Sequence, residues 1–283
     1  MASVLFSRAL VVVRGGGDLA SGVIYRLRRA GFPVMVTELE SPLLVRRTVS
    51  YGDAVYNRVV TVDGLTARLV DNRHDVASTL AAGEIPVVVD PGLCLWPELR
   101  PVVIVDGRLA KVNLDTRITD APLVIGLGPG FTVGADCHVV IETNRGHDLG
   151  RVIYQGSAAP DTGEPGQVKG QTHSRVLRAS SAGHVRPAVR IGAQLEAGAV
   201  IANLNGEPVI APFSGVLRGL IHEQVVVRAG MKIGDLDPRG DVKICYSISE
   251  KSLAVGGGVL EAVLAAPQVR SYLVETDETS TSL

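Results

Sequence analysis

The feature that most constrains the fold of this chain is a glycine loop between an apolar run and an amphipathic helix. Residues 9–13 are all apolar, and Gly15, Gly16 and Gly17 follow after a single arginine. Residues 18–30 then have the spacing of an amphipathic helix, and a second apolar run begins at residue 33. This order predicts a βαβ unit, in which a helix joins two parallel strands.

Further apolar runs extend this pattern into a mostly parallel sheet. Those at residues 86–89, 101–105, 123–125 and 138–141 are short and bounded by Gly, Pro, Asp or Asn, as in covered strands. Residues 74–82 predict one intervening helix. Aromatic residues make up only 4% of the chain, which favours buried parallel strands over an aromatic-rich sandwich. The predicted fold class is α/β, with a Rossmann-like, mostly parallel sheet.

A repeat with an offset of 32 residues marks a second, β-rich part of the chain, where residues 183–204 align with residues 215–236. Each copy has a turn glycine, alternating β-type residues and a second glycine, which is Gly198 in the first copy and Gly230 in the second. Such paired hairpins resemble the barrel-sandwich of biotinyl and lipoyl domains. The tip at residues 205–208 contains no lysine for biotin or lipoate. A swinging-arm carrier is therefore not expected, and a structural or docking role is.

Changes in composition divide the chain into three regions. Residues 157–170 are rich in Gly, Pro and polar residues and predict a long loop ahead of a boundary near residue 180. We expect a nucleotide- or cofactor-binding α/β region at residues 1–180 and the duplicated hairpins at residues 181–240. A C-terminal helix and a polar tail should occupy residues 241–283.

The first glycine loop has the G-x-G-x-x-A pattern of loops that bind pyrophosphate. The first glycine permits the tight turn, the second lets a phosphate approach the backbone, and the free amides of the helix face it. An acid at the end of the second strand is placed to bind a ribose diol. The predicted binding residues are Arg14, Gly15, Gly16, Gly17, Asp18 and Glu38. The alternative is a tight turn that uses glycine only for its conformation and binds nothing.

A second glycine-rich segment, residues 126–131, also follows an apolar run, and a polar stretch at residues 136–147 comes soon after it. Open α/β sheets bind ligands at such strand ends. The candidate binding residues are Gly126, Gly128, Gly130, Arg145 and His147. The alternative is a surface pair of Glu142 with Arg145, and a loop role for His147. The polar stretch lacks the spacing of metal ligands, and Cys94, Cys137 and Cys245 stand alone, so no metal site is predicted.

Several classes of function lose support from the sequence. A formal net charge of −1 gives no electrostatic reason to expect nucleic acid as a partner. No apolar run approaches the roughly 18 residues of a membrane span, so a cytoplasmic protein without a membrane partner is expected. There is no G-x-S-x-G motif and no Walker lysine, which disfavours hydrolases and kinases. Formation of a homo-oligomer stays open.

Five longer motifs together resemble one family, the YqeB-type accessory proteins of selenium-dependent molybdenum hydroxylase systems. The motifs are RGGGDLASG (residues 14–22), AKVNLDT (110–116), VIGLGPGF (124–131), IETNRGHDLGRVI (141–153) and GMKIGDLDPRG (230–240). One departure is Asn144, where the family often has methionine. The family is similar in its implied role to XdhC-type factors, whose Rossmann domain handles the molybdenum cofactor before the cofactor is inserted into the enzyme.

The resemblance implies a role in maturing a molybdenum hydroxylase, with the apo-hydroxylase as partner. Combined with the glycine loop, it predicts a ligand that carries a pyrophosphate, either molybdopterin dinucleotide or an NAD-like nucleotide. Two alternatives stay open. An NAD(P)-dependent oxidoreductase ranks second because no Tyr-x-x-x-Lys pair or catalytic histidine is evident, and no catalytic residue is assigned. The third is a non-catalytic assembly scaffold, whose C-terminal barrel docks the apo-hydroxylase.

Overall fold

The computed structural model describes residues 4–94, 99–161, 163 and 174–274, and nine strands of this part form one sheet. Its order is β3-β4-β5-β2-β1-β6-β7-β8-β9; the strands from β4 to β8 are parallel, while β3 and β9 are antiparallel to their neighbours. The strands are β1 (Val11–Arg14), β2 (Val34–Glu38), β3 (Val59–Val62), β4 (Leu65–Leu69), β5 (Ile85–Val89), β6 (Val103–Asp106), β7 (Leu123–Leu127), β8 (Val139–Ile141) and β9 (Val152–Ile153).

The α/β class is confirmed, and the predicted strands and helices of this region are present within one or two residues. From β1 the sheet grows through β2 and β5 to one side, and then through β6, β7 and β8 to the other. The carboxyl ends of β1 and β6 therefore flank the point where the winding reverses. The hairpin of β3 and β4 and the short strand β9 were not predicted.

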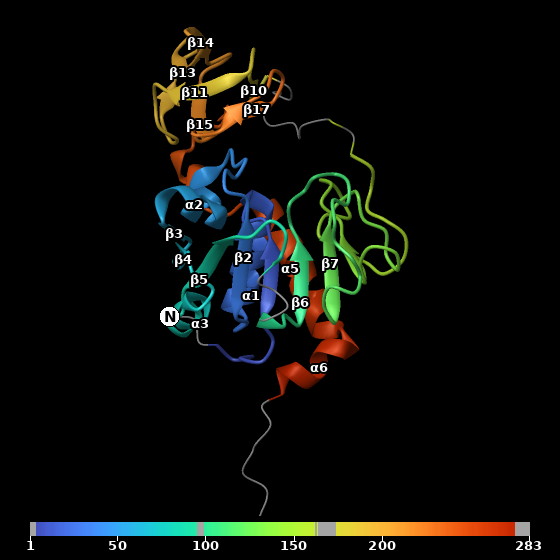
Figure 1. The fold of residues 1–283 in the computed structure, drawn as a ribbon. Helices are drawn as coiled ribbons and strands as arrows, with labels where there is room; N and C mark the ends of the chain where they lie inside the picture. The colour runs from blue at the N-terminus through green and yellow to red at the C-terminus, as the bar shows by residue number, and fades with distance from the viewer. Residues whose placement is uncertain (1–3, 95–98, 162, 164–173, 275–283) are drawn as a thin grey trace, which may run out of the picture.

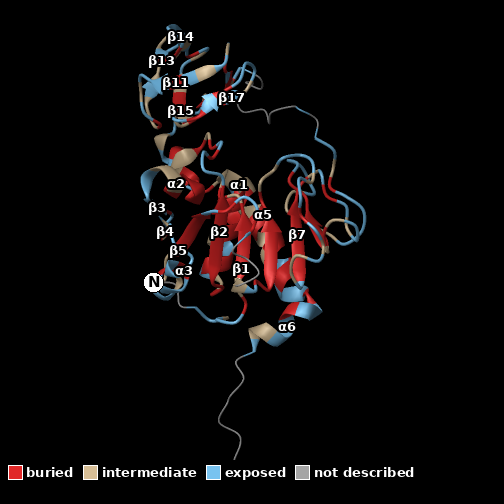
Figure 2. Ribbon diagram, in the orientation of Figure 1, coloured by how far each residue is buried: buried red, intermediate tan, exposed pale blue. Residues whose placement is uncertain are grey.

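Helices cover one face of the sheet, and a helix with loop segments covers the other. On the first face lie α1 (Asp18–Arg29) and α5 (Glu250–Ala265), which pack against each other and against alternate residues of the strands such as Val11 and Val13. On the second face α3 (Asp75–Ala81) covers Val12 and its neighbours. Burial on both faces explains the continuous apolar runs in the sequence, and Figure 2 shows the strands as the buried centre of this unit.

The remaining helices of the described residues connect these layers or extend them. They are η1 (Arg47–Val49), η2 (Tyr51–Asp53), α2 (Ala54–Asn57), η3 (Val242–Cys245) and α6 (Pro267–Leu273). No single helix of the described residues is long and apolar enough to span a membrane. The predicted polar tail at the C-terminus lies outside the described residues, as does most of the predicted loop at residues 157–170.

The repeat forms two antiparallel sheets, each of four strands in the part that the structure describes. One sheet has the order β10-β17-β15-β12 and the other the order β14-β13-β11-β16. The strands are β10 (Val176–Arg178), β11 (Gly183–Pro187), β12 (Gln194–Leu195), β13 (Val200–Leu204), β14 (Glu207–Ile210), β15 (Gly215–Leu220), β16 (Val226–Val227) and β17 (Lys232–Asp237). A shift of 32 residues carries each strand onto its counterpart in the other sheet. The two sheets enclose one apolar core.

This β module sits at one end of the α/β unit, above α2 (Figure 1). Arg47 donates a hydrogen bond of 2.9 Å to the carbonyl of Leu220, and the rings of Tyr56 and His222 stack with centroids 3.9 Å apart. The module takes in β10, which precedes the predicted boundary at residue 181, and after η3 the chain returns to the first unit as α5. The α/β unit is therefore built from both ends of the chain.

Candidate functional site

The loop between β1 and α1 uses its three glycines in different ways. Gly15 has a φ of +85°, a backbone conformation that favours glycine. A Cβ on Gly16 would lie 2.5 Å from the backbone nitrogen of Gly52, so this position is closed by protein. A Cβ on Gly17, the N-cap of α1, would meet only the Leu44 side chain, at 3.5 Å. Space beside the start of α1 is therefore left at Gly17 and not at Gly16.

Glu38 holds the glycine loop in place. Its carboxylate accepts hydrogen bonds from the backbone N–H of Gly16 at 2.7 Å and of Leu39 at 3.0 Å, and the side chain is buried. Burial raises the pKa of Glu38, although both hydrogen bonds act in the opposite direction. The ribose contact stays a prediction, and a ribose would have to share a carboxylate that already fixes the loop.

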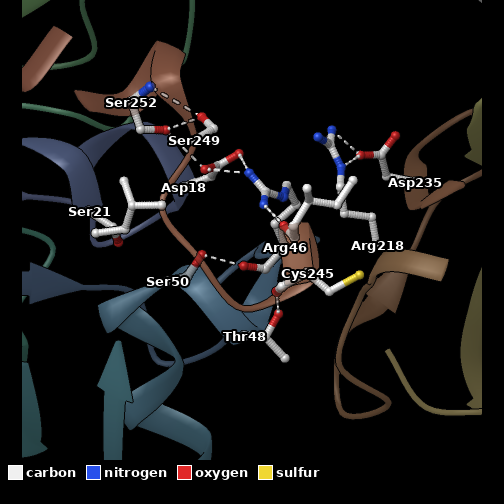
Figure 3. A network of polar contacts seen from close by, with 12 residues as sticks. Asp18, Ser21, Arg46, Thr48, Ser50, Arg218, Asp235, Cys245, Ser249 and Ser252 are labelled. Carbon is white, nitrogen blue, oxygen red and sulfur yellow. Dashed lines mark hydrogen bonds and ion pairs between the residues drawn. The ribbon is translucent and has the colours of Figure 1, made fainter. Parts of the chain in front are cut away.

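Asp18 connects the start of α1 to the C-terminal part of the chain (Figure 3). Its two carboxylate oxygens each lie 2.9 Å from the same guanidinium nitrogen of Arg46, and the Ser252 hydroxyl donates to it at 3.0 Å. Arg46 also donates to the carbonyl of Ile244 at 2.8 Å. The predicted ligand residue Asp18 thus joins α1 to α5 and η3 through protein contacts.

Five side chains form a charged cluster at the carboxyl ends of β1 and β6: Arg14, Asp106, Arg108, Asp115 and Thr116. Asp106 accepts from Arg108 and, at 2.6 Å, from the Thr116 hydroxyl. Arg14 donates to the same hydroxyl at 2.6 Å, and both arginines reach Oδ1 of Asp115 at 2.8 Å. Only Arg14 of this cluster was predicted as a binding residue. The position of Asp106 and Arg108 directly after an apolar run was the signal that could have identified them.

Burial and charge act against each other in this cluster. Burial lowers the pKa of Arg14, and the neighbouring charge of Arg108 lowers it further. For Asp115 burial acts to raise the pKa, but the hydrogen bonds and charges of the two arginines outweigh it and lower the pKa. The ion pairs therefore keep Asp115 ionised, and the cluster holds two cations and two anions at the point where the winding of the sheet reverses.

The glycines of the second loop allow close packing. The Cβ position of Gly126 is 2.5 Å from the ring of Phe131, and that of Gly130 is 2.6 Å from the backbone nitrogen of Val112. Gly128 has a φ of +73°. These contacts give each glycine a conformational role, and the predicted anion contact of this loop stays a prediction.

The polar stretch after β8 is held by α5. Arg145 pairs with Glu250, the first residue of α5, at 2.8 Å, and both side chains are at least half exposed. Glu142 does not form the surface pair with Arg145 that was the alternative prediction, because its carboxylate accepts two backbone N–H groups instead. His147 is exposed. Arg145 and His147 thus stand at the surface of the carboxyl edge.

Lys251 relates this stretch to the first glycine loop. Burial and the charge of Arg145 lower the pKa of Lys251, while the carboxylates of Asp18 and Glu142 raise it. The contacts of Asp18 with Ser252 at 3.0 Å and of Arg145 with Glu250 at 2.8 Å place members of both predicted groups at the start of α5. A single pocket that includes both stays a prediction.

Two hollows in the surface lie away from these residues. A groove of about 790 Å³ between the α/β unit and the β module is lined by both units, with Arg47, Asp53 and Arg190 among its charged residues. A second hollow lies over β4 and α3. Neither is lined by any of the predicted binding residues. In the described part of the chain no group of three His, Cys, Asp or Glu side chains is placed to hold a metal. Cys137 and Cys245 are buried, whereas Cys94 is exposed.

No family model matches the sequence. A curated sequence is 49% identical to this chain over 255 residues, which make up 90% of the chain and 47% of that relative. The chain is similar to YqeB of Escherichia coli (strain K12). YqeB is described as uncharacterized, so the match supports the resemblance seen in the motifs and carries no activity. The chain spans about half the length of YqeB.

Two solved structures have a weak likeness to this one. An aspartoacylase family protein from Mesorhizobium loti is 12% identical, with a TM-score of 0.26, over 81% of this chain and 84% of its own. A succinylglutamatedesuccinylase/aspartoacylase from Rhodobacter sphaeroides is 15% identical, with a TM-score of 0.25, over 81% of this chain and 85% of its own. Scores this low support no inference on fold or activity.

Proposed function

We propose that this protein binds a ligand with a pyrophosphate group at the carboxyl edge of its sheet, between the loops that follow β1 and β6. The observation that carries the proposal is the open backbone at Gly17 at the start of α1, beside the reversal of the winding. Free amides of a helix N-terminus favour phosphate, and open α/β sheets bind ligands where the strand order reverses.

The proposal includes a Rossmann-like sheet and a barrel-sandwich module. The order β5-β2-β1-β6-β7-β8 corresponds to the 3-2-1-4-5-6 order of dinucleotide-binding folds. The second half departs from that fold, because α5 from the C-terminal region covers β7 and β8. A shift of 32 residues along the chain maps the strands of one sheet of the module onto those of the other, as expected for a barrel-sandwich.

The biological role that we propose is that of an accessory factor in the maturation of a selenium-dependent molybdenum hydroxylase. This role rests on the motif resemblance, and the ligand would be molybdopterin dinucleotide or an NAD-like nucleotide. The charge of Glu38 disfavours a 2′-phosphate, so NAD should bind more tightly than NADP. The β module supplies a surface on which an apo-hydroxylase would dock.

Replacement of Gly17 with valine tests the binding edge. Its φ of −73° suits a residue with a side chain, so the melting temperature should change little while the affinity for NAD or ADP falls. Gly16→Ala is the contrast, since its Cβ would meet the Gly52 backbone and should lower the melting temperature. Unchanged nucleotide affinity in a folded Gly17→Val protein would refute the proposed edge.

The ligand itself can be identified by native mass spectrometry of protein purified from cells supplied with molybdate and selenium. A bound mass that matches a pyrophosphate-containing cofactor supports the proposal. Purified protein without such a mass, together with no affinity for NAD or ADP, would contradict it.

A further inference from the structure

In the charged cluster at β1 and β6, two arginines hold the carboxylate of Asp115 in the way that they would hold an anionic ligand. The Arg14 and Arg108 guanidinium groups approach the same oxygen, Oδ1 of Asp115, each at 2.8 Å. Arg14 is the last residue of β1 and Arg108 follows the end of β6 at Asp106, and these two strands flank the reversal of the winding. Two guanidinium groups that converge on one oxygen form an arrangement suited to a phosphate, which offers more acceptor oxygens than a carboxylate.

The two carboxylates of the cluster differ in how firmly they are held. Asp106 is 2% exposed at its side chain and is bonded to Arg108 and to Thr116. Asp115 is 52% exposed, although the arginines that it pairs with are 2% and 20% exposed. Water can hydrate Asp115 when it leaves the arginines, whereas the buried charge of Arg14 requires another anion in its place. Asp106 is thus a fixed partner of Arg108, and Asp115 is the carboxylate that an incoming anion can replace.

Arg14 also keeps unused bonding capacity. Its Nε is buried and has no hydrogen-bond partner among the described residues, although the other nitrogens of the guanidinium bond Thr116 and the carbonyl of Pro91. Buried polar atoms in native structures are almost always satisfied by protein, water or ligand. This nitrogen is not exposed to solvent, so the contacts of Arg14 to an incoming anion would come from the nitrogen that now pairs with Asp115.

The segment that carries Asp115 has an unfavourable backbone conformation. It connects β6 to β7 without helix or strand, and both Leu109 and Lys111 have positive φ, at +54° and +65°. Such values are uncommon for residues with a side chain and concentrate at switch and ligand-binding regions. Asn113 fixes the backbone beside Asp115, because its side-chain amide donates to Asp136 and to the carbonyl of Thr116. Displacement therefore needs to move only the Asp115 side chain.

We propose that Arg14 and Arg108 form a phosphate-binding site that Asp115 fills in the free protein. A phosphate or pyrophosphate group displaces Asp115, takes its place against both arginines, and leaves Asp106 and Thr116 as the fixed base of the site. The inference rests on the proposed function, since it assigns a residue contact to the anionic part of the same ligand. Asp115 then competes with the ligand and lowers its apparent affinity.

Calorimetric titration with inorganic pyrophosphate tests the proposal. Asp115→Asn should bind about tenfold more tightly than the unaltered protein, because one competing charge is removed. Asp148→Asn is the matched control, since Asp148 is also exposed and paired with one arginine, Arg151, and its affinity should stay unchanged. Asp115→Ala should behave like Asp115→Asn, and circular dichroism should show that each variant is folded.

The outcomes separate this proposal from the proposed function. If the unaltered protein binds pyrophosphate or NAD and neither Asp115 variant binds pyrophosphate more tightly than Asp148→Asn, the competition by Asp115 is refuted and the binding edge stands. If no form of the protein binds pyrophosphate, ADP or NAD, both proposals fail.

Discussion

Replacement of Gly256 with alanine should loosen the contact between α5 and α1. A Cβ on Gly256 would lie 2.6 Å from the backbone carbonyl carbon of Gly22, where ordinary contact begins at 3.4 Å. Backbone atoms cannot rotate away as a side chain can, so the two helices would have to separate by about 1 Å. The adjacent Gly257 has no heavy atom within 4 Å of its Cβ position and provides a matched control in the same helix.

The expected magnitude follows from this geometry. Overpacking of a well-packed contact costs about 1–3 kcal/mol, and the cost should lie at the upper end because backbone meets backbone. Alanine recovers up to about 1 kcal/mol of helix propensity relative to glycine. We therefore expect Gly256→Ala to lower the free energy of unfolding by about 2 kcal/mol, and Gly257→Ala to raise it by about 0.5–1 kcal/mol.

Urea unfolding followed by circular dichroism measures both changes. The same slope of free energy against urea in all three proteins would show that stability and not the extent of unfolding differs. Because α5 carries Ser252, which bonds Asp18, the Gly256→Ala protein should also lose affinity for the ligand. A Gly256→Ala protein as stable as Gly257→Ala would refute the close packing of these helices.

Three further predictions concern single positions. Because burial raises the pKa of Glu38, the native state binds this proton more tightly, so stability should fall as the pH rises from the group's ordinary pKa through its raised one. Glu38→Gln should lack this fall and exposed Glu40→Gln should retain it, as urea midpoints from pH 4 to 8 would reveal. No biotin or lipoate should be attached to the module, since Asn205 occupies the β13–β14 turn; a mass increment on a lysine there would overturn this. Arg145→Lys should weaken ligand binding and hydroxylase maturation while the melting temperature changes little, since the ion pair with Glu250 is exposed; full maturation by this variant would exclude the role of Arg145.

The βαβ unit could be predicted because its determinants are local. The apolar run of β1, the glycines after it and the spacing of α1 are neighbours in sequence, and each favours the same structure. The predicted helix 18–30 and the observed Asp18–Arg29 differ by one residue for this reason. The repeat at residues 183–236 likewise predicted a β-rich module of two equivalent halves. It did not reveal that each copy contributes strands to both sheets, as when β11 pairs with β16 and β12 with β15.

The charged cluster could not be predicted because it depends on strand order. Asp106 and Arg108 meet Arg14 only because β6 lies beside β1, although these strands are separated in sequence by the whole first half of the sheet. The three glycines at residues 256–258 are similar. Glycine disfavours a helix, and the reason for two of them appears only when Gly256 is seen against Gly22 and Gly258 against Gly150.

A crystal structure of the protein with bound ADP is the most direct test of the binding edge. We expect the phosphates within about 3 Å of the backbone amides at Gly17 and the first turn of α1. Arg14 and Arg108 should contact a phosphate oxygen in place of Asp115. A nucleotide bound instead in the groove lined by Arg47 and Arg190, with the glycine loop free of ligand, would contradict the proposed function.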